Sequence, residues 1–146
     1  MPLFSLSPLV LHLYKESSLT GWEIAGFAFG LVAILGEAIA DRQLERFRSN
    51  PQNRGAVYRD GLWRVSRPPN YFFEWLYWWA YVIMGVGMPC GVVTLLGPVL
   101  MLLFLFKLTG IPYTEQQALS SRGDAYREYQ KATPIFLPWF PQKTER

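Results

Sequence analysis

Long apolar blocks free of Lys, Arg and Asp alternate with charged blocks along this chain. Residues 21–40 form one such block, and Leu95 to Phe106 is the most hydrophobic run. A soluble protein spreads charge over its whole surface, whereas a bilayer requires about 20 consecutive, predominantly apolar residues for each crossing. Since 51% of the 146 residues are apolar, we expect an all-α, polytopic membrane helix bundle that forms a single domain.

The expected bundle has about three spanning helices. The predicted segments are an apolar N-terminal segment with a short loop (1–20), a membrane helix (21–40), an arginine-rich loop (41–70), a membrane helical hairpin (71–108) and a tail (109–146). Within the first segment, residues 2–14 are apolar but too short to span a bilayer, so they form either a surface segment or the stump of a longer membrane helix. Glycine and proline at positions 85–91 divide the hairpin into helices at 71–87 and 91–108. The tail is polar and helix-prone from Thr114 to Thr133.

Arginines gather between the first helix and the hairpin: Arg42, Arg46, Arg48, Arg54, Arg59, Arg64 and Arg67. The positive-inside rule places this segment in the cytoplasm. Two further crossings return the chain to the same side at Lys107, so the tail is also expected to be cytoplasmic. The formal net charge of +3 comes mostly from this cluster, which suits anionic lipid or a phosphorylated small molecule. Nucleic acid is not expected as a partner, because the cluster lies between membrane segments.

Two groups of polar residues carry candidate chemistry. Asn70 follows two prolines and is a plausible N-cap, while Glu74 would lie at the start of a bilayer segment. An ionisable group there needs a partner, a ligand or water, and Arg67 is the expected partner at the same depth. Glu37 and Asp41 are four residues apart on one helix face. They form either a solvated ion-pair network or the polar wall of a site for a ligand with hydroxyls and phosphates.

Other reaction classes lack the necessary residues. The single Cys90 and the single His12 provide neither a metal site nor a nucleophile–base pair, which disfavours metal and hydrolytic chemistry. No glycine-rich phosphate loop follows a strand, so a nucleotide would have to be held by side chains at the membrane surface. Arginine suits this task because its planar fork donates two hydrogen bonds to phosphate.

The order of several motifs resembles a bacterial branch of the steroid 5α-reductase superfamily over residues 22–141. The stretches that carry the resemblance are Glu37-Ala-Ile-Ala-Asp41-Arg-Gln43, Asn53-Arg-Gly55, Gly61-Leu-Trp63-Arg64-x-Ser66-Arg67-x-Pro69-Asn70-Tyr71-Phe-x-Glu74-Trp75, Leu96-Gly97-Pro98, Gly110-Ile-Pro112-x-x-Glu115, Tyr126-Arg-Glu-Tyr129-Gln and Leu137-Pro-Trp139-Phe-Pro141. The resemblance implies a membrane oxidoreductase that passes hydride from NADPH to the conjugated C=C bond of a lipid-like or steroid-like enone.

The same resemblance implies which residues form the site. Glu74 and Tyr71 would be catalytic, Asp41 and Arg48 would lie on the adenosine and phosphate side, and the tail would close over the cofactor. The implied cofactor-binding residues are Glu37, Asp41, Arg48, Arg64, Arg67, Asn70, Tyr71, Glu74, Glu115, Arg122 and Tyr126. The partners would be the lipid bilayer and a hydrophobic small-molecule substrate.

Two departures from the family pattern leave alternatives open. Pro68 stands where the family usually has histidine, and family members commonly carry additional helices before residues 21–40, so this chain is expected to be amino-terminally short. A homo-oligomer or partner helices could complete the bundle. The alternatives are a membrane methyltransferase of the isoprenylcysteine or phospholipid type that uses S-adenosylmethionine, and a catalytically silent truncated member.

Overall fold

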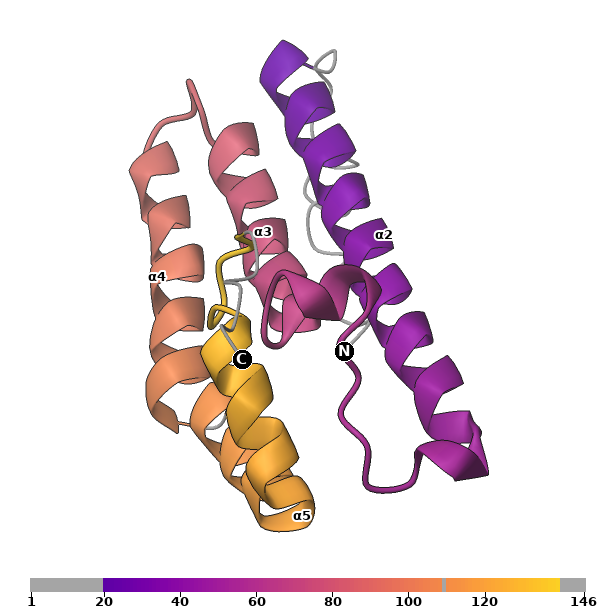
Figure 1. Cartoon of the computed structure of the whole chain (residues 1–146). Helices are drawn as coiled ribbons and strands as arrows, with labels where there is room; N and C mark the ends of the chain where they lie inside the picture. The colour runs from indigo at the N-terminus through magenta and orange to yellow at the C-terminus, as the bar shows by residue number, and fades with distance from the viewer. Residues whose placement is uncertain (1–19, 109, 140–146) are drawn as a thin grey trace.

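The computed structural model describes residues 20–108 and 110–139, and every regular element in these ranges is helical (Figure 1). In order, the elements are α2 (Gly21–Ser49), η2 (Pro51–Asn53), η3 (Gly61–Arg64), α3 (Pro69–Met84), η4 (Gly91–Leu95), α4 (Leu96–Leu103), the π-helical η5 (Phe104–Leu108) and α5 (Ile111–Ala132). The expected all-α class is confirmed. Most of the predicted apolar segment 1–20 and the last seven residues lie outside the described residues.

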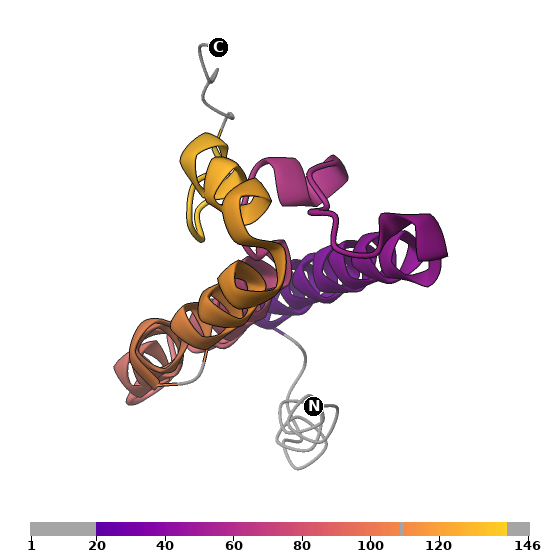
Figure 2. The ribbon, with the colours of Figure 1, turned by 60° about the horizontal axis from the view of Figure 1, so that its bottom comes forward.

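Helices α4, α3 and α2 lie side by side in one layer, with α3 in the middle (Figures 1 and 2). Helix α5 and the connection from α2 to α3 lie on one face of this layer, near its lower end in Figure 1. This arrangement separates the molecule into an apolar helical layer and a more polar assembly at one end of it.

Small residues allow α2 and α3 to pack closely. The buried positions of α2 share a small or absent side chain: Gly26, Gly30, Ala33, Gly36 and Ala40. A Cβ atom built on Gly26 would lie 2.7 Å from the backbone oxygen of Ala80, and one on Gly36 would lie 2.3 Å from the Phe73 ring. The close helix contact that the Gly26-x-x-x-Gly30 spacing permits is therefore realised against α3.

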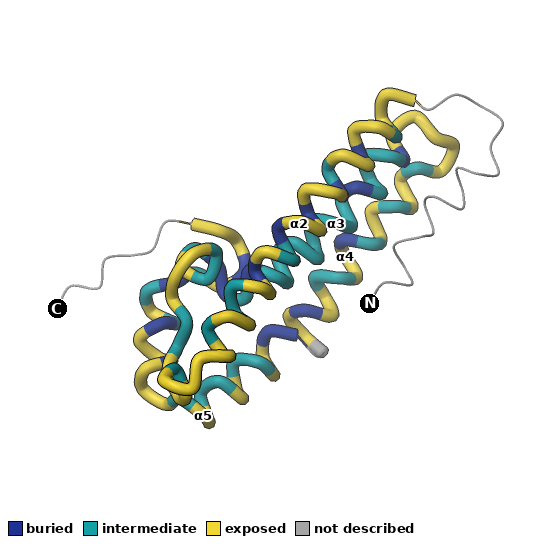
Figure 3. The backbone as a smooth tube through the Cα atoms, turned by 90° about the vertical axis from the view of Figure 1, so that its right-hand side faces the viewer, coloured by how far each residue is buried: buried dark blue, intermediate teal, exposed yellow. Residues whose placement is uncertain are grey.

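Two helical runs are long and apolar enough to cross a membrane by length and composition: α2 and the run from Gly91 to Ala132. Only 28% and 12% of their apolar windows are buried within the described structure. Exposed residues therefore recur along the whole length of these helices (Figure 3). The core helix of a soluble protein buries its apolar side chains, whereas a membrane helix presents them to lipid.

Helix α2 extends beyond the predicted 21–40, so the arginine-rich segment is partly helical. It begins at a capping box, in which Thr20 Oγ1 accepts from the Glu23 backbone N–H and Glu23 Oε2 accepts from the Thr20 N–H at 2.7 Å. No helix breaker follows Asp41 until Asn50, where Pro51 ends the helix. The first three arginines of the cluster consequently lie on α2 rather than in a loop.

Helix α3 begins earlier than the sequence suggested. Pro69 is its first residue and Pro68 takes the N-cap position, so Asn70 is not the N-cap. Proline is well suited to the first helical position because its missing N–H would have no helical partner there. Asn70 is thereby placed inside the first turn, where its side chain is free for another role.

The second half of the hairpin and the tail helix also differ from their predicted forms. The run 91–108 is helical but comprises three geometries, η4, α4 and η5. Helix α5 begins at Ile111, three residues before the predicted Thr114, and Pro112 fits its first turn.

Substituting Gly26 with alanine should separate α2 from α3 and destabilise the protein. Its new methyl group would meet the Ala80 carbonyl, which is backbone and cannot rotate away, at an expected cost of about 1–3 kcal/mol. Gly21→Ala is the matched control, because a Cβ there meets nothing within 4 Å. Thermal unfolding in detergent, followed by circular dichroism, should show a lower Tm for Gly26→Ala alone. Equal Tm values for the two variants would contradict the close packing.

Candidate functional site

Five of the predicted site residues lie where α2 meets α3 and are called the seam cluster: Glu37, Asp41, Asn70, Tyr71 and Glu74. The packing of Phe73 against Gly36 sets the register of the two helices. Glu74 follows Phe73, and Glu37 follows Gly36. The carboxylates of Glu37, Asp41 and Glu74 therefore lie close enough to interact electrostatically. The charges of Glu74 and Asp41 also act on Tyr71. The structure therefore brings these residues together at one level of the helical layer.

Asn70 contributes an unsatisfied acceptor to the seam cluster. Its Oδ1 atom is buried and has no hydrogen-bond donor among the described residues. A buried polar atom without a partner is rare in folded proteins and calls for an explanation such as a ligand or water. Asn70 is thus the member of the cluster whose hydrogen-bonding capacity is most clearly left open.

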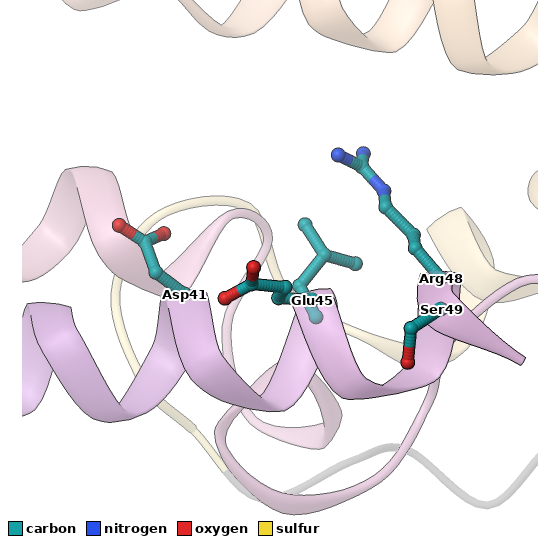
Figure 4. Close-up of a pocket in the computed structure, with 5 residues that line it drawn as sticks. Asp41, Glu45, Arg48 and Ser49 are labelled. Carbon is teal, nitrogen blue, oxygen red and sulfur yellow. The ribbon is translucent and has the colours of Figure 1, made fainter.

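The carboxyl end of α2 carries an open depression of about 490 Å³. It is lined by Asp41, Leu44, Glu45, Arg48 and Ser49, and the labelled side chains of Figure 4 extend from this one helix. Glu37, Asp41 and Arg48 are spaced at i, i+4 and i+11, which places them on one helix face. The depression therefore connects Asp41 of the seam cluster with an arginine, whereas Glu37 and the α3 members do not line it.

Arg67 belongs to a different cluster, which is called the tail clasp: Arg67, Glu115, Gln130 and Thr133. Arg67 is 6% exposed, and its Nη1 donates to Glu115 Oε1 at 2.7 Å. Its Nε donates to the Thr133 carbonyl at 2.7 Å, and Glu115 Oε2 accepts from Gln130 Nε2 at 3.0 Å. The expected pairing of Arg67 with Glu74 is therefore wrong, because Glu115 approaches the guanidinium from the tail.

The segment after α5 is held by backbone bonds beside the tail clasp. The Phe136 N–H donates to the Arg67 carbonyl at 3.1 Å, and the Arg67 N–H donates to the Pro134 carbonyl at 3.2 Å. Phe136 is buried against the rings of Phe72, Trp75 and Phe106. This proline-punctuated stretch caps the layer through aromatic contacts that its sequence does not specify.

Tyrosines of α5 attach the tail to the segment before α3. The Tyr129 hydroxyl donates to the Trp63 carbonyl, and burial raises the pKa of Tyr129, so the phenol stays protonated as a donor. Burial, together with the charge of Glu115, also raises the pKa of Tyr126. The spacing of Tyr126 and Tyr129 marks one face of α5, and this signal could have identified Tyr129 as a buried residue.

The remaining predicted residues have different surroundings. Arg122 is half-buried and its charge acts on Tyr126, whereas Arg64 is exposed at the end of η3. Sequence reasoning missed Trp79, whose buried Nε1–H has no acceptor among the described residues. It also missed Trp63, whose Nε1 donates to the Ala40 carbonyl at 2.9 Å and joins η3 to α2.

Replacing Arg67 with methionine should loosen the tail and destabilise the protein by about 3–5 kcal/mol, because Glu115 would keep a partly buried charge without its cation. Arg127→Met is the matched control, since Arg127 forms only an exposed pair with Asp124 and should change stability by about 0–1 kcal/mol. Chemical denaturation in detergent, followed by tryptophan fluorescence, measures both. Equal losses of unfolding free energy in the two variants would show that the tail clasp stabilises the protein no more than an exposed ion pair does.

Comparisons with known proteins identify a family. The family model described as "Protein of unknown function (DUF1295)" matches residues 2–133, which covers both clusters up to Thr133 and begins before the described residues. Neither a search of curated proteins nor one of solved structures finds a match. Because the family model matches most of the chain, this protein belongs to the DUF1295 family.

Proposed function

We propose that this protein is a multi-pass membrane oxidoreductase that uses NADPH to reduce the conjugated C=C bond of a lipid-like or steroid-like enone. The resemblance to the steroid 5α-reductase superfamily motivates the reaction. The observation that carries the proposal is the shared α2 face of Glu37, Asp41 and Arg48, on which Asp41 and Arg48 line the open depression.

The chemistry along this face suits a dinucleotide. The unsatisfied Asn70 Oδ1 would accept a hydrogen bond from the carboxamide N–H₂ of a nicotinamide. Carboxylates of the seam cluster would accept hydrogen bonds from ribose hydroxyls. Arg48 lies eleven residues beyond Glu37, about 16 Å along the helix axis, and its guanidinium would donate to phosphate oxygens. The seam cluster would thus hold the ring, and the carboxyl end of α2 would hold the phosphates.

Reduction of an enone adds a hydride to one carbon and a proton to the neighbouring carbon. When bound, NADPH supplies the hydride. Tyr71 and Glu74 are the titratable groups of α3 in the seam cluster, so one of them would hold the proton. Both side chains are half-buried, and this partial exclusion of water would strengthen their interactions with a bound ring.

The proposed topology has three crossings, formed by α2, α3 and the helical run 91–108. The arginine-rich segment and α5 would lie in the cytoplasm, since basic residues cluster at that end of the layer. The turn between α3 and η4 lies at the opposite end and would face the other compartment (Figure 1).

The single cysteine of the chain tests this topology. Cys90 is exposed in the turn between α3 and η4, so a membrane-impermeant maleimide should label it in right-side-out vesicles and not in sealed inside-out vesicles. Ser49→Cys in a Cys90→Ser background places the thiol at the end of α2, and its labelling should be reversed. Labelling of both positions from the same side would overturn the three-crossing arrangement.

Substituting Glu74 with glutamine tests the site. The change removes one charge at nearly constant size, so NADPH should bind about tenfold more weakly or worse if Glu74 accepts from the cofactor, while the fold is kept. Binding is measured by calorimetric titration of NADPH into the purified protein in detergent. Glu128→Gln, which changes an exposed carboxylate on α5, is the matched control and should bind as the unmodified protein does.

A competition experiment separates the alternative chemistry. S-adenosylmethionine should not displace NADPH, because it carries no phosphate to occupy Arg48. If the folded protein shows no saturable NADPH binding, or if S-adenosylmethionine alone binds, the reductase proposal is wrong.

A further inference from the structure

The arginines of α2 lie on two different helix faces. Arg48 shares its face with Glu37 and Asp41 and lines the depression. Arg42 and Arg46 are four residues apart, and both are exposed. At 100° per residue, Arg42 is rotated by about 120° from Arg48 around the helix axis, so this pair points away from the polar face. The arginine-rich segment therefore contains two surfaces rather than one.

The pair continues an exposed apolar ridge. Leu31 and Leu35 precede Arg42 by eleven and seven residues, which is the spacing of side chains on one helix face. These leucines are 50% and 53% exposed, and they lie on the side of α2 away from its buried small residues. The same face of α2 thus carries leucine side chains up to Leu35 and arginine side chains from Arg42 onward.

The change occurs at the depth where a membrane helix leaves the hydrocarbon. Residues 21–40 span about 30 Å, which matches the thickness of the hydrocarbon core. Arg42 and Arg46 occupy the next two turns of α2, so their guanidinium groups would lie among lipid headgroups. A ridge that meets acyl chains along its leucines would meet headgroups at these two arginines.

Neither guanidinium is neutralised by another described residue. The ion pairs among the described residues use Arg59, Arg67 and Arg127. Asp41 and Glu45, the acidic residues adjacent to the pair along α2, line the depression instead. The pair therefore keeps its hydrogen-bonding capacity for a partner outside the protein.

We propose that Arg42 and Arg46 form a binding site for the phosphate of an anionic phospholipid in the leaflet that faces the arginine-rich segment. A guanidinium donates two parallel hydrogen bonds to a phosphate, and two of them one helical turn apart hold the headgroup beside the leucine ridge. The site is distinct from the proposed cofactor site, because it lies on another face of α2. It depends on α2 crossing the membrane but not on the reductase activity.

The test compares lipid selectivity of three proteins. Wild type, Arg42→Gln/Arg46→Gln and Arg48→Gln are reconstituted in nanodiscs of equal parts phosphatidylglycerol and phosphatidylcholine, and retained lipids are counted by native mass spectrometry. Each basic residue near a bilayer contributes about fivefold to the attraction of anionic lipid, so the double variant should lose roughly 10- to 30-fold in preference for phosphatidylglycerol. Arg48→Gln should lose no more than the about fivefold preference expected of one basic residue, and soluble glycerol phosphate should not compete.

A second measurement uses the wild-type chain alone, so the result does not depend on whether the variants fold. Phosphatidylglycerol with a photoreactive headgroup should crosslink within residues 39–49. Crosslinks confined to α5 or to the loop around Arg59 would overturn the proposal, and so would unchanged selectivity in a folded double variant. Competition by glycerol phosphate, or an equal loss in Arg48→Gln, would assign the phosphate chemistry to the depression instead.

Discussion

The close approach of α2 and α3 determines where every polar group of the seam cluster lies. Glycines and alanines bring the two backbones together, and Phe73 fits over Gly36, so the register of one helix against the other is fixed by shape. This register brings Glu37 within the electrostatic influence of Glu74. Larger side chains on α2 would move these carboxylates apart, so the same small residues that pack the helices also position the candidate site.

The arginines of the cluster lie in at least three different settings, although the sequence shows one group. Arg67 is buried and holds the tail through Glu115 and Thr133. Arg48 lines an open depression together with Asp41. Arg42 and Arg46 point outward from an apolar ridge. Burial, neighbouring charge and helix face distinguish these settings, and none of the three is visible from the spacing of positive charges along a chain.

The sequence predicted the helical class and the shared helix face of Glu37 and Asp41, because helical periodicity defines both, whereas the resemblance alone implied one site with Tyr71 and Glu74. The sequence-based prediction was wrong where a residue pairs with a partner that is distant in the sequence. The pairing of Arg67 with Glu115 joins residues 48 positions apart, and local patterns do not contain that information. Asn70 was misassigned because Pro69 competes for the start of α3 and is the better residue there.

The bonds between Arg67 and the segment after α5 also constrain the order of assembly. Thr133 and Arg67 are 66 residues apart, and α3, η4 and α4 lie between them. During synthesis the Arg67 guanidinium can bind the Thr133 carbonyl only after the chain has been extended to residue 133. Contacts of large sequence separation form only after loop closure. The polar assembly beside the helical layer therefore closes late, after the helices that separate its two halves in the sequence have been synthesised.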